Sequence, residues 1–467
     1  MVNSKTQPCG AEVIRSTRGT SVCPRRDRAW VLAVAVLGST MAFVDESVVN
    51  VALPKIEADL GTTLAAMQWV INAYTLCMSA LLLIGGAAAD RFGRRLLFLI
   101  GLVTFTLASI VCGAAPGAAA LIAARAIQGV GAALLIPCSL AIIGAAFDPE
   151  ERGAAIGIWS GASALAAGAG PLLGGWLIDH LSWRAIFWIN PLIAVPTLWI
   201  AVLRLPESGD PAARAGLDWG GALLAFGGLA GLVYGLIAAS SLGWRDVTVA
   251  GSLTAGALLL AGFVLEERRS RAPMVPLRLF GSRSFSGVTL LTLFLYGALG
   301  GAFFFLPFLL IQAHGFSATA AGAMYLPFTL VLGVLSRWSG GLADRFGARR
   351  PLIVGPLIAA VGFALLAVVS GAPRYWVYLG PMMVLGFGMA VTVAPLTTTV
   401  INSVAEPETG AASGINNVVA AVASLLVIAV LGTLVADSLV ATARLVMSGA
   451  AALALAGAAI GALTIRI

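Results

Sequence analysis

The sequence predicts an all-helical integral membrane protein of about fourteen transmembrane helices, and three observations lead to that fold class. Hydrophobic residues make up 59% of the 467 residues and charged residues only 10%, whereas a soluble domain carries about 25% charged residues. Apolar runs of ~18 or more residues recur from Ala29 to Ile465, each long enough to cross the ~30 Å hydrocarbon core. The basic residues behind the net charge of +7 form short clusters between these runs, so we expect no nucleic-acid partner.

Each apolar run is predicted to be a helix, because in lipid a helix satisfies its own backbone N–H and C=O groups. Residues 1–28 are polar and basic, and we expect them to form a disordered cytoplasmic tail. No small-residue cleavage site follows the first apolar run, so this run is expected to be a membrane span rather than a signal peptide. The predicted spans are residues 29–54, 68–89, 96–114, 118–146, 153–179, 184–204, 217–240, 247–265, 284–312, 318–343, 351–371, 374–402, 411–436 and 439–465.

The distribution of Lys and Arg predicts the orientation of the chain. With both termini on one side, that side carries 21 of the 28 basic residues and the opposite loops carry five. By the positive-inside rule, both termini are therefore expected in the cytoplasm, with the protein in the cell membrane.

An internal repeat divides the chain into two halves. The sequence Ala-Asp-Arg-Phe-Gly at residues 89–93 recurs at residues 343–347, which makes the second and tenth spans equivalent. We therefore expect a six-helix bundle over 29–204, a linker with two inserted helices over 205–283, and a second six-helix bundle over 284–467. Such halves are common in transporters that bind substrate between them near the membrane midplane.

The loop after the second span resembles the hallmark motif of the major facilitator superfamily, G-x-L-A-D-R-x-G-R-[KR], with Ala88 at the Leu position. The resemblance implies the major facilitator fold and a breakable cytoplasmic latch, in which a small glycine permits close helix packing and an aspartate accepts hydrogen bonds from arginines. The alternative is a simple positive-inside anchor. The latch residues are Gly86, Asp90, Arg91, Gly93, Arg94 and Arg95, with Asp344, Arg345 and Gly347 in the second copy.

Acidic and basic residues inside two spans are candidates for proton coupling. Residues 43–54 resemble the L-D-x-[ST]-[IV]-V-N-V-A-L-P signature of the fourteen-span drug:proton antiporters, and residues 121–133 match the superfamily's second motif. Arg125 needs a buried partner, and its distance from the outer end of its span places it at the depth of Asp45. Asp45 and Glu46 are costly to keep ionised together, and they point about 100° apart. Asp45 holds the family's acidic position, so we favour it as the coupling carboxylate, with Glu46 as a secondary proton or substrate contact.

Two alternatives remain open for these residues. Arg125 could extend to the outer membrane surface instead of facing the bundle, and the two acids could serve only to neutralise it and fix the helix packing.

The fifth span carries a further pattern, G-x8-G-x3-G-P-x2-G-G, which resembles the antiporter motif and departs from it only at Ala166. Its glycines are expected to pack closely against a helix of the other half, and its proline to kink the helix. The motif residues are Gly157, Gly170, Pro171, Gly174 and Gly175.

The resemblance implies a proton-coupled antiporter that exports amphipathic, cationic small molecules by alternating access, as a monomer, driven by the proton gradient without a bound cofactor. Alternatives are a dedicated exporter of an endogenous metabolite or antibiotic, a proton-coupled importer, and a membrane sensor or scaffold. No enzyme is expected, because His180 and His314 are isolated and no metal-ligand spacing is present. Candidate residues of the substrate cavity are Asn50, Gln128, Tyr296, Tyr325 and Asn416.

Overall fold

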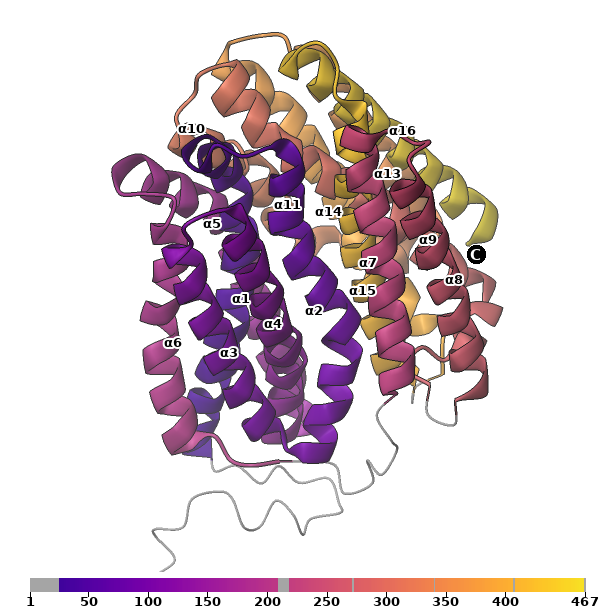
Figure 1. The fold of residues 1–467 in the computed structure, drawn as a ribbon. Helices are drawn as coiled ribbons and strands as arrows, with labels where there is room; N and C mark the ends of the chain where they lie inside the picture. Colours follow the sequence, from indigo (N-terminus) through magenta and orange to yellow (C-terminus); the bar gives the residue numbers. More distant parts are fainter. Residues whose placement is uncertain (1–24, 209–217, 271–272, 340, 406–407, 466–467) are drawn as a thin grey trace, which may run out of the picture.

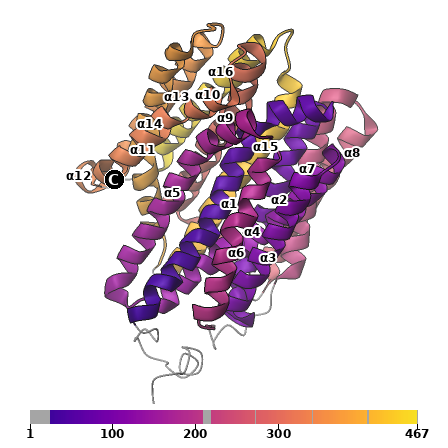
Figure 2. The same ribbon diagram turned by 90° about the vertical axis from the view of Figure 1, so that its left-hand side faces the viewer.

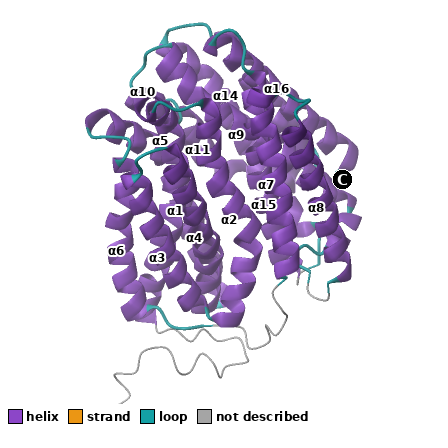
Figure 3. Ribbon diagram, viewed as in Figure 1, coloured by secondary structure: helices purple, strands orange, loops and turns teal. Residues whose placement is uncertain are grey.

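The computed structural model describes residues 25–208, 218–270, 273–339, 341–405 and 408–465, which form helices and short loops (Figures 1 and 3). Fourteen helices in this part of the chain are long and apolar enough to cross a membrane, and no strand occurs among the described residues. The predicted fold class is confirmed. Most of the predicted tail, residues 1–24, lies outside the described residues, but helix α1 already begins at Arg25, inside the predicted tail.

The first six helices form the N-terminal bundle, in which α1 packs on α4, α5 and α6, and α4 packs on α2 and α3. The bundle begins with α1, whose helix continues through Pro54 to Leu60, beyond the predicted end of the span. The helices are α1 (Arg25–Leu60), α2 (Leu64–Phe92), α3 (Arg94–Ala114), α4 (Ala118–Ala146), α5 (Pro149–His180) and α6 (Ala185–Arg204).

The C-terminal bundle repeats this arrangement with more interruptions. Its second span, predicted as one helix over 318–343, is divided into α10, α11 and α12, and α9 ends in a π-helical turn, η2. The elements are η1 (Leu277–Gly281), α9 (Arg283–Pro307), η2 (Phe308–Ala313), α10 (Ala318–Ala323), α11 (Leu326–Ser339), α12 (Leu342–Phe346), α13 (Pro351–Val369), η3 (Tyr375–Tyr378), α14 (Leu379–Asn402), α15 (Thr409–Leu431), η5 (Gly432–Leu434) and α16 (Leu439–Thr464).

The two inserted helices, α7 (Trp219–Leu242) and α8 (Val247–Arg269), form a hairpin beside the bundles. Helix α7 contacts α2 of the N-terminal bundle and α15 of the C-terminal bundle, and α8 packs on α7 (Figure 1). Asp246 caps α8 by accepting from the backbone N–H of Thr248 at 2.8 Å. Hydrogen bonds from Thr248 hold the pKa of this exposed carboxyl below its ordinary value. The hairpin thus lies across the side of the molecule where α2 of one bundle meets α15 of the other.

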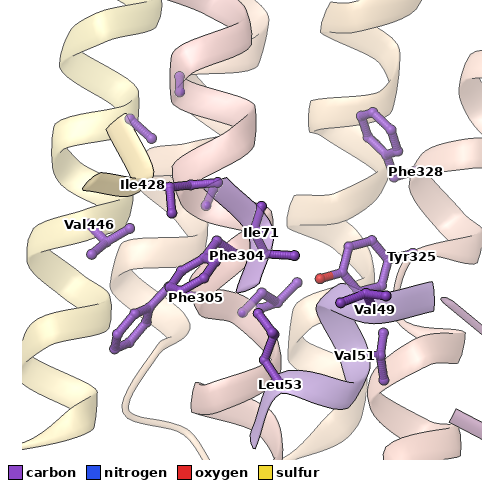
Figure 4. Close-up of a cluster of buried hydrophobic side chains, with 14 of the residues drawn as sticks. Val49, Val51, Leu53, Ile71, Phe304, Phe305, Tyr325, Phe328, Ile428 and Val446 are labelled. Atoms are coloured by element: carbon purple, nitrogen blue, oxygen red, sulfur yellow. The ribbon is translucent and has the colours of Figure 1, made fainter. Parts of the chain in front are cut away.

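The bundles meet along α5 and α10 and along α2 and α15, with α5 lying between the two halves in the turned view (Figure 2). A large apolar cluster extends across this interface, and Figure 4 shows Val49 of α1 beside the ring of Tyr325, which belongs to the turn between α10 and α11. We name the side of the molecule where α1 begins the tail end, and the side where α1 ends and α5 meets α10 the far end.

Candidate functional site

A fully buried ion pair lies inside the N-terminal bundle. The carboxylate of Asp45 on α1 accepts from the guanidinium of Arg125 on α4, and both side chains are 0% exposed. The second carboxylate oxygen of Asp45 accepts from Gln128 Nε2 and from Asn190 Nδ2, each at 2.8 Å. Gln128 Oε1 in turn accepts from Arg125 Nη1 at 2.8 Å. The pairing of Arg125 with Asp45 is the one that their similar depth predicts, and it argues against an Arg125 extended to the membrane surface.

The surroundings of Arg125 fix its position further. Its Nε donates to the carbonyl oxygen of Val70 at 3.2 Å, and its guanidinium carbon lies 4.2 Å from the centre of the Tyr74 ring. Asn190 also donates to Ser109 Oγ at 2.9 Å. A buried charge is tolerated only when it is paired and hydrogen-bonded, and here four helices supply those partners. The pair therefore ties α1, α2, α4 and α6 together.

Glu46 points away from this pair and into a cavity of about 310 Å³ between the two bundles. Of the residues that line the cavity, Glu46 alone has an ionisable carboxylate. The lining comes from α1, α5, α9, the turn before α11 and α11 itself; it consists of Phe43, Glu46, Ser47, Asn50, Ala164, Ala167, Gly168, Pro171, Phe303, Tyr325, Phe328, Thr329 and Leu332.

Aromatic rings form one side of this cavity. Phe303 lies edge-on to Tyr325 and Phe328, with ring centres 5.0 and 5.1 Å apart, and the Tyr325 hydroxyl donates to the Phe303 carbonyl oxygen at 2.9 Å. The carboxylate of Glu46 receives no hydrogen bond and forms no ion pair with any residue that the structure describes. The site therefore combines apolar surface, ring faces and one negative group without a partner.

The candidate cavity residues are thus only partly brought together. Asn50 and Tyr325 line the cavity, and Asn50 Nδ2 donates to the backbone oxygen of Glu46 at 3.1 Å. Gln128 is instead buried in the Asp45 network. Tyr296 is not among the lining residues, and Asn416 accepts from Thr292 Oγ1 at 2.8 Å within the C-terminal bundle. These three residues do not line the cavity in this structure, because a span's sequence does not give the rotation of its helix toward the cavity, and their part in substrate binding stays a prediction.

The glycines of the antiporter motif bring α5 close to two helices. A Cβ atom at Gly170 or Gly174 would collide with Ser47 or Val48 of α1, in the same bundle, and one at Gly175 would collide with the Ala318 carbonyl of α10, in the opposite bundle. Among the glycines of the motif, Gly175 is therefore the one that lets α5 pack closely against a helix of the other half.

Two other members of the motif differ in role. The carbonyl of Pro171 lies against Gly322 of α10, whereas no atom lies within 4 Å of a Cβ built at Gly157. The second half of the motif therefore seals the far end of the cavity, and its first glycine has no packing role in this structure.

Polar contacts reinforce this far-end seal. Asp179, near the end of α5, accepts from the backbone N–H groups of Ala318 and Thr319 at 3.1 and 2.7 Å and from the Thr319 hydroxyl at 2.6 Å. Gln312 in η2 donates to Glu57 of α1 at 2.7 Å. Asp179 therefore caps the first turn of a helix that belongs to the other bundle. Sequence analysis did not single out Asp179 or Glu57.

The latch of the first repeat forms within the N-terminal bundle. Asp90 accepts from Arg94 at 2.8 and 2.9 Å, and Gly93 adopts a φ of 110° between α2 and α3. Arg91 is exposed and lies over the neighbouring Phe92 ring. The guanidinium of Arg95 donates to the Val202 carbonyl at 2.7 Å.

Close packing at this latch depends on Gly85 rather than on Gly86. A Cβ at Gly85 would collide with the Ala133 carbonyl of α4, whereas one at Gly86 would make an ordinary contact with Pro137 at 3.6 Å.

Glu207 is a latch residue that sequence analysis did not assign. Its carboxylate accepts from the backbone N–H groups of Arg95 and Leu96 at 3.1 and 3.3 Å, and so caps α3. The only sequence signal was the Leu-Pro-Glu-Ser stretch after α6, which has no helical periodicity.

The second copy of the latch is described less completely. Gly347 has a φ of 73° after α12, and Arg345 is exposed. The side chain of Asp344 lies outside the described part of the chain.

Comparisons with known proteins agree with this architecture. The family model described as Major Facilitator Superfamily matches residues 35–428. The chain is 35% identical over 419 residues to the tetracenomycin C resistance and export protein of Streptomyces glaucescens, covering 88% of this chain and 77% of that protein. It is 38% identical over 418 residues to the puromycin resistance protein pur8 of Streptomyces alboniger, covering 88% and 82% of the two chains. The solved structure of the POT family transporter PepTSo matches with a TM-score of 0.72 at 16% identity, over 94% of this chain and 97% of that one.

The likeness to the solved structure concerns the fold, and the family match and the two resistance proteins cover most of the sequence. Together with the fourteen helices and the two bundles around a central cavity, they establish what kind of protein this is. The chain belongs to the major facilitator superfamily, and the relatives that it matches over most of its length are resistance and export proteins.

Proposed function

We propose that this protein is a proton-coupled antiporter of the cell membrane that exports amphipathic, cationic small molecules by alternating access. The observation that carries the proposal is the position of Glu46 in an aromatic cavity between the two bundles, where its carboxylate has no partner among the described residues. Both bundles of a single chain line this cavity. One chain can therefore form the whole site, which supports transport by a monomer.

Glu46 suits an exchange between a proton and an organic cation. A cation about 4 Å from an ionised carboxylate gains roughly 4 kcal/mol at an effective dielectric constant of about 20. The rings of Phe303, Tyr325 and Phe328 offer apolar contact and, where a ring face is turned to the charge, a further ~0.5–2 kcal/mol. A protonated Glu46 lacks the charge that attracts the substrate. Proton and substrate therefore compete, which is what antiport requires.

Asp45 has a different environment, and we propose a different part for it. Its carboxylate is already neutralised by Arg125 and accepts from Gln128 and Asn190. Such a pair holds α1 in place, so that the adjacent Glu46 is directed into the cavity. Sequence analysis favours Asp45 as the coupling carboxylate, and it remains the second candidate.

Alternating access needs the seal at one end to break while the other end closes. In this structure the contacts of Asp179 and Gly175 close the far end. The excess of basic residues at the tail end supports a cytoplasmic position for that end, and in that orientation the cavity lies on the cytoplasmic side of the seal. The names of the relatives, which denote resistance and export, support outward transport.

Export of one dedicated metabolite is a second candidate. It is favoured by the relative from Streptomyces glaucescens, which is named for the export of tetracenomycin C. A broad panel of cations discriminates the two, because a dedicated exporter would move few of them.

The test uses everted membrane vesicles from an efflux-deficient bacterial host, acidified inside by respiration. Addition of tetraphenylphosphonium should release protons through the wild-type protein, recorded with a fluorescent pH probe. Glu46→Gln should abolish this release, because the variant can exchange no proton at that site. Glu266→Gln, which removes an exposed carboxylate on α8 outside both bundles, serves as the matched control and should behave as wild type.

Three results would contradict parts of the proposal. Full proton release by Glu46→Gln together with its loss in Asp45→Asn would assign the exchange to Asp45. Proton release that is unchanged in both Glu46→Gln and Asp45→Asn would show that neither carboxylate of α1 couples proton movement to transport. Proton-coupled movement of the cation out of everted vesicles would indicate uptake by the cell rather than export.

A further inference from the structure

A groove of about 540 Å³ lies between α13 and α16, and it shares no lining residue with the central cavity. Small side chains hollow it out, among them Ala364 on α13 and Ser448 and Ala452 on α16. Val368 and Leu455, at its rim, are 74% and 51% exposed. Since α13 and α16 are membrane-spanning helices, this exposed surface faces lipid.

Arg444, at one end of the groove, is exposed and has no hydrogen-bond or ion-pair partner among the residues that the structure describes. Arg444 lines the groove and lies in α16, about 8 Å along the helix from its first residue, Leu439. Its Nη2 atom reaches the end of α13, 2.7 Å from the position that a Cβ on Gly371 would take. An unpaired arginine inside a span is costly, and it requires an anion or water as a partner.

The dimensions of the groove fit one leaflet of a bilayer. Its α16 wall runs from Arg444 to Leu455, which is about 16 Å at a rise of ~1.5 Å per residue. Half of a ~30 Å hydrocarbon core is about 15 Å. The positive charge thus lies at one end of an apolar channel that is one leaflet long.

We propose that this groove is a binding site for an anionic phospholipid. The phosphate binds the guanidinium of Arg444, whose planar N–H donors match phosphate oxygens. One acyl chain then lies along Ser448, Ala452 and Leu455, against the α13 wall. A second groove, beside Arg245, also combines one arginine with small and apolar side chains. Its lining comes only from α8 and the residues just before it, so this groove lacks a second helix as a wall.

The experiment measures lipid binding directly and is independent of transport. The purified full-length protein is titrated with phosphatidylglycerol or with phosphatidylcholine of the same acyl chains, and native mass spectrometry counts the bound lipids. The wild-type protein should retain more phosphatidylglycerol than phosphatidylcholine. Arg444→Gln should lower this retention roughly fivefold, which is the effect of one basic residue at an anionic lipid surface.

Two further variants separate the parts of the site. Ala452→Phe fills the groove without changing charge, and it should lower retention of phosphatidylglycerol. Arg374→Gln removes an exposed arginine that lines neither groove, and it should leave retention unchanged.

The proposal is overturned if wild type and Arg444→Gln retain the two lipids equally, or if Arg374→Gln lowers retention as much as Arg444→Gln does. Unchanged retention in Ala452→Phe would overturn the proposal as well, because the lipid would then bind outside the groove. If Arg444→Gln does not fold, the Ala452→Phe result still decides.

Discussion

Arg125 shows how a single residue organises the N-terminal bundle. Its guanidinium bonds the carboxylate of Asp45, the side chain of Gln128 and the backbone of Val70, and it lies over the ring of Tyr74. Two buried charges of this kind rarely add stability compared with apolar residues of similar size, because both lose their hydration. Asp45 directly precedes the cavity residue Glu46 in the chain, so we expect the pair to be kept because it fixes the position of Glu46.

At the residue scale, the first prediction concerns this pair. Arg125→Leu leaves the Asp45 carboxylate buried without its counter-charge, and we expect it to lower the free energy of unfolding by ~3–5 kcal/mol. The double variant Asp45→Leu/Arg125→Leu removes both charges, and its free energy of unfolding should fall clearly less than that of Arg125→Leu. Denaturant titration of the detergent-purified proteins, followed by tryptophan fluorescence, measures the difference.

Arg184→Leu is a suitable control, because Arg184 forms a partly exposed ion pair with Asp59 at 3.0 Å. Exposed pairs contribute only ~0–1 kcal/mol, so its effect should be small. A double variant as unstable as Arg125→Leu alone would contradict the assignment of the penalty to an unpaired charge.

The sequence predicted the main geometry of this site but not its full membership. Helical rise predicted that Asp45 and Arg125 lie at one depth, and helical rotation predicted that Glu46 faces elsewhere than Asp45. Sequence analysis assigned neither Asn190, which bonds Asp45, nor Phe303, which lines the cavity. Which helix faces a neighbouring helix depends on tilt and rotation, which are set by packing across the whole bundle.

At the scale of elements, the sequence predicted where helices exist better than where they break. The span predicted over 318–343 is interrupted at Met324 and Tyr325, directly before Leu326 and Pro327. A proline restrains the preceding residue and favours the start of a new helix, which accounts for the beginning of α11. Tyr325, at this break, lines the cavity.

The second prediction concerns α5. A Cβ at Gly175 collides with the Ala318 carbonyl of α10, so Gly175→Ala should open the far-end seal. Spin labels at Lys55→Cys and Arg374→Cys, in a protein whose five native cysteines are replaced, report the separation of the bundles at that end. Double electron–electron resonance should show the distance distribution shifted to longer values.

Gly157→Ala is the matched control, because no atom lies within 4 Å of its new methyl group. A glycine-to-alanine change in a helix interior otherwise favours the helix by up to ~1 kcal/mol, and this effect is common to both variants. The same distance distribution in Gly175→Ala and Gly157→Ala would show that close packing at Gly175 does not hold the far end closed.

The whole molecule consists of two bundles that must separate at alternate ends. Backbone groups of α10 are held by a carboxylate of the opposite bundle, Asp179, and α7 contacts both α2 and α15 on another side. The hairpin of α7 and α8 therefore has to accommodate relative movement of the bundles. Helix α8 packs mainly on α7, whereas α7 contacts both bundles. Relative movement of the bundles must therefore change the contacts of α7.

The last prediction tests whether the far-end seal governs this movement. Asp179→Ala removes three hydrogen bonds between the bundles, and each contributes roughly 0.5–1.5 kcal/mol. Even ~1.4 kcal/mol changes the ratio of closed to open molecules about tenfold, so the same spin-label pair should report a larger far-end-open population. Asp246→Ala removes a comparable helix cap at the same end, within the α7–α8 hairpin, and it should leave the distribution unchanged. If Asp179→Ala and Asp246→Ala give the same distribution as the labelled parent protein, apolar packing rather than the Asp179 cap holds the far end closed.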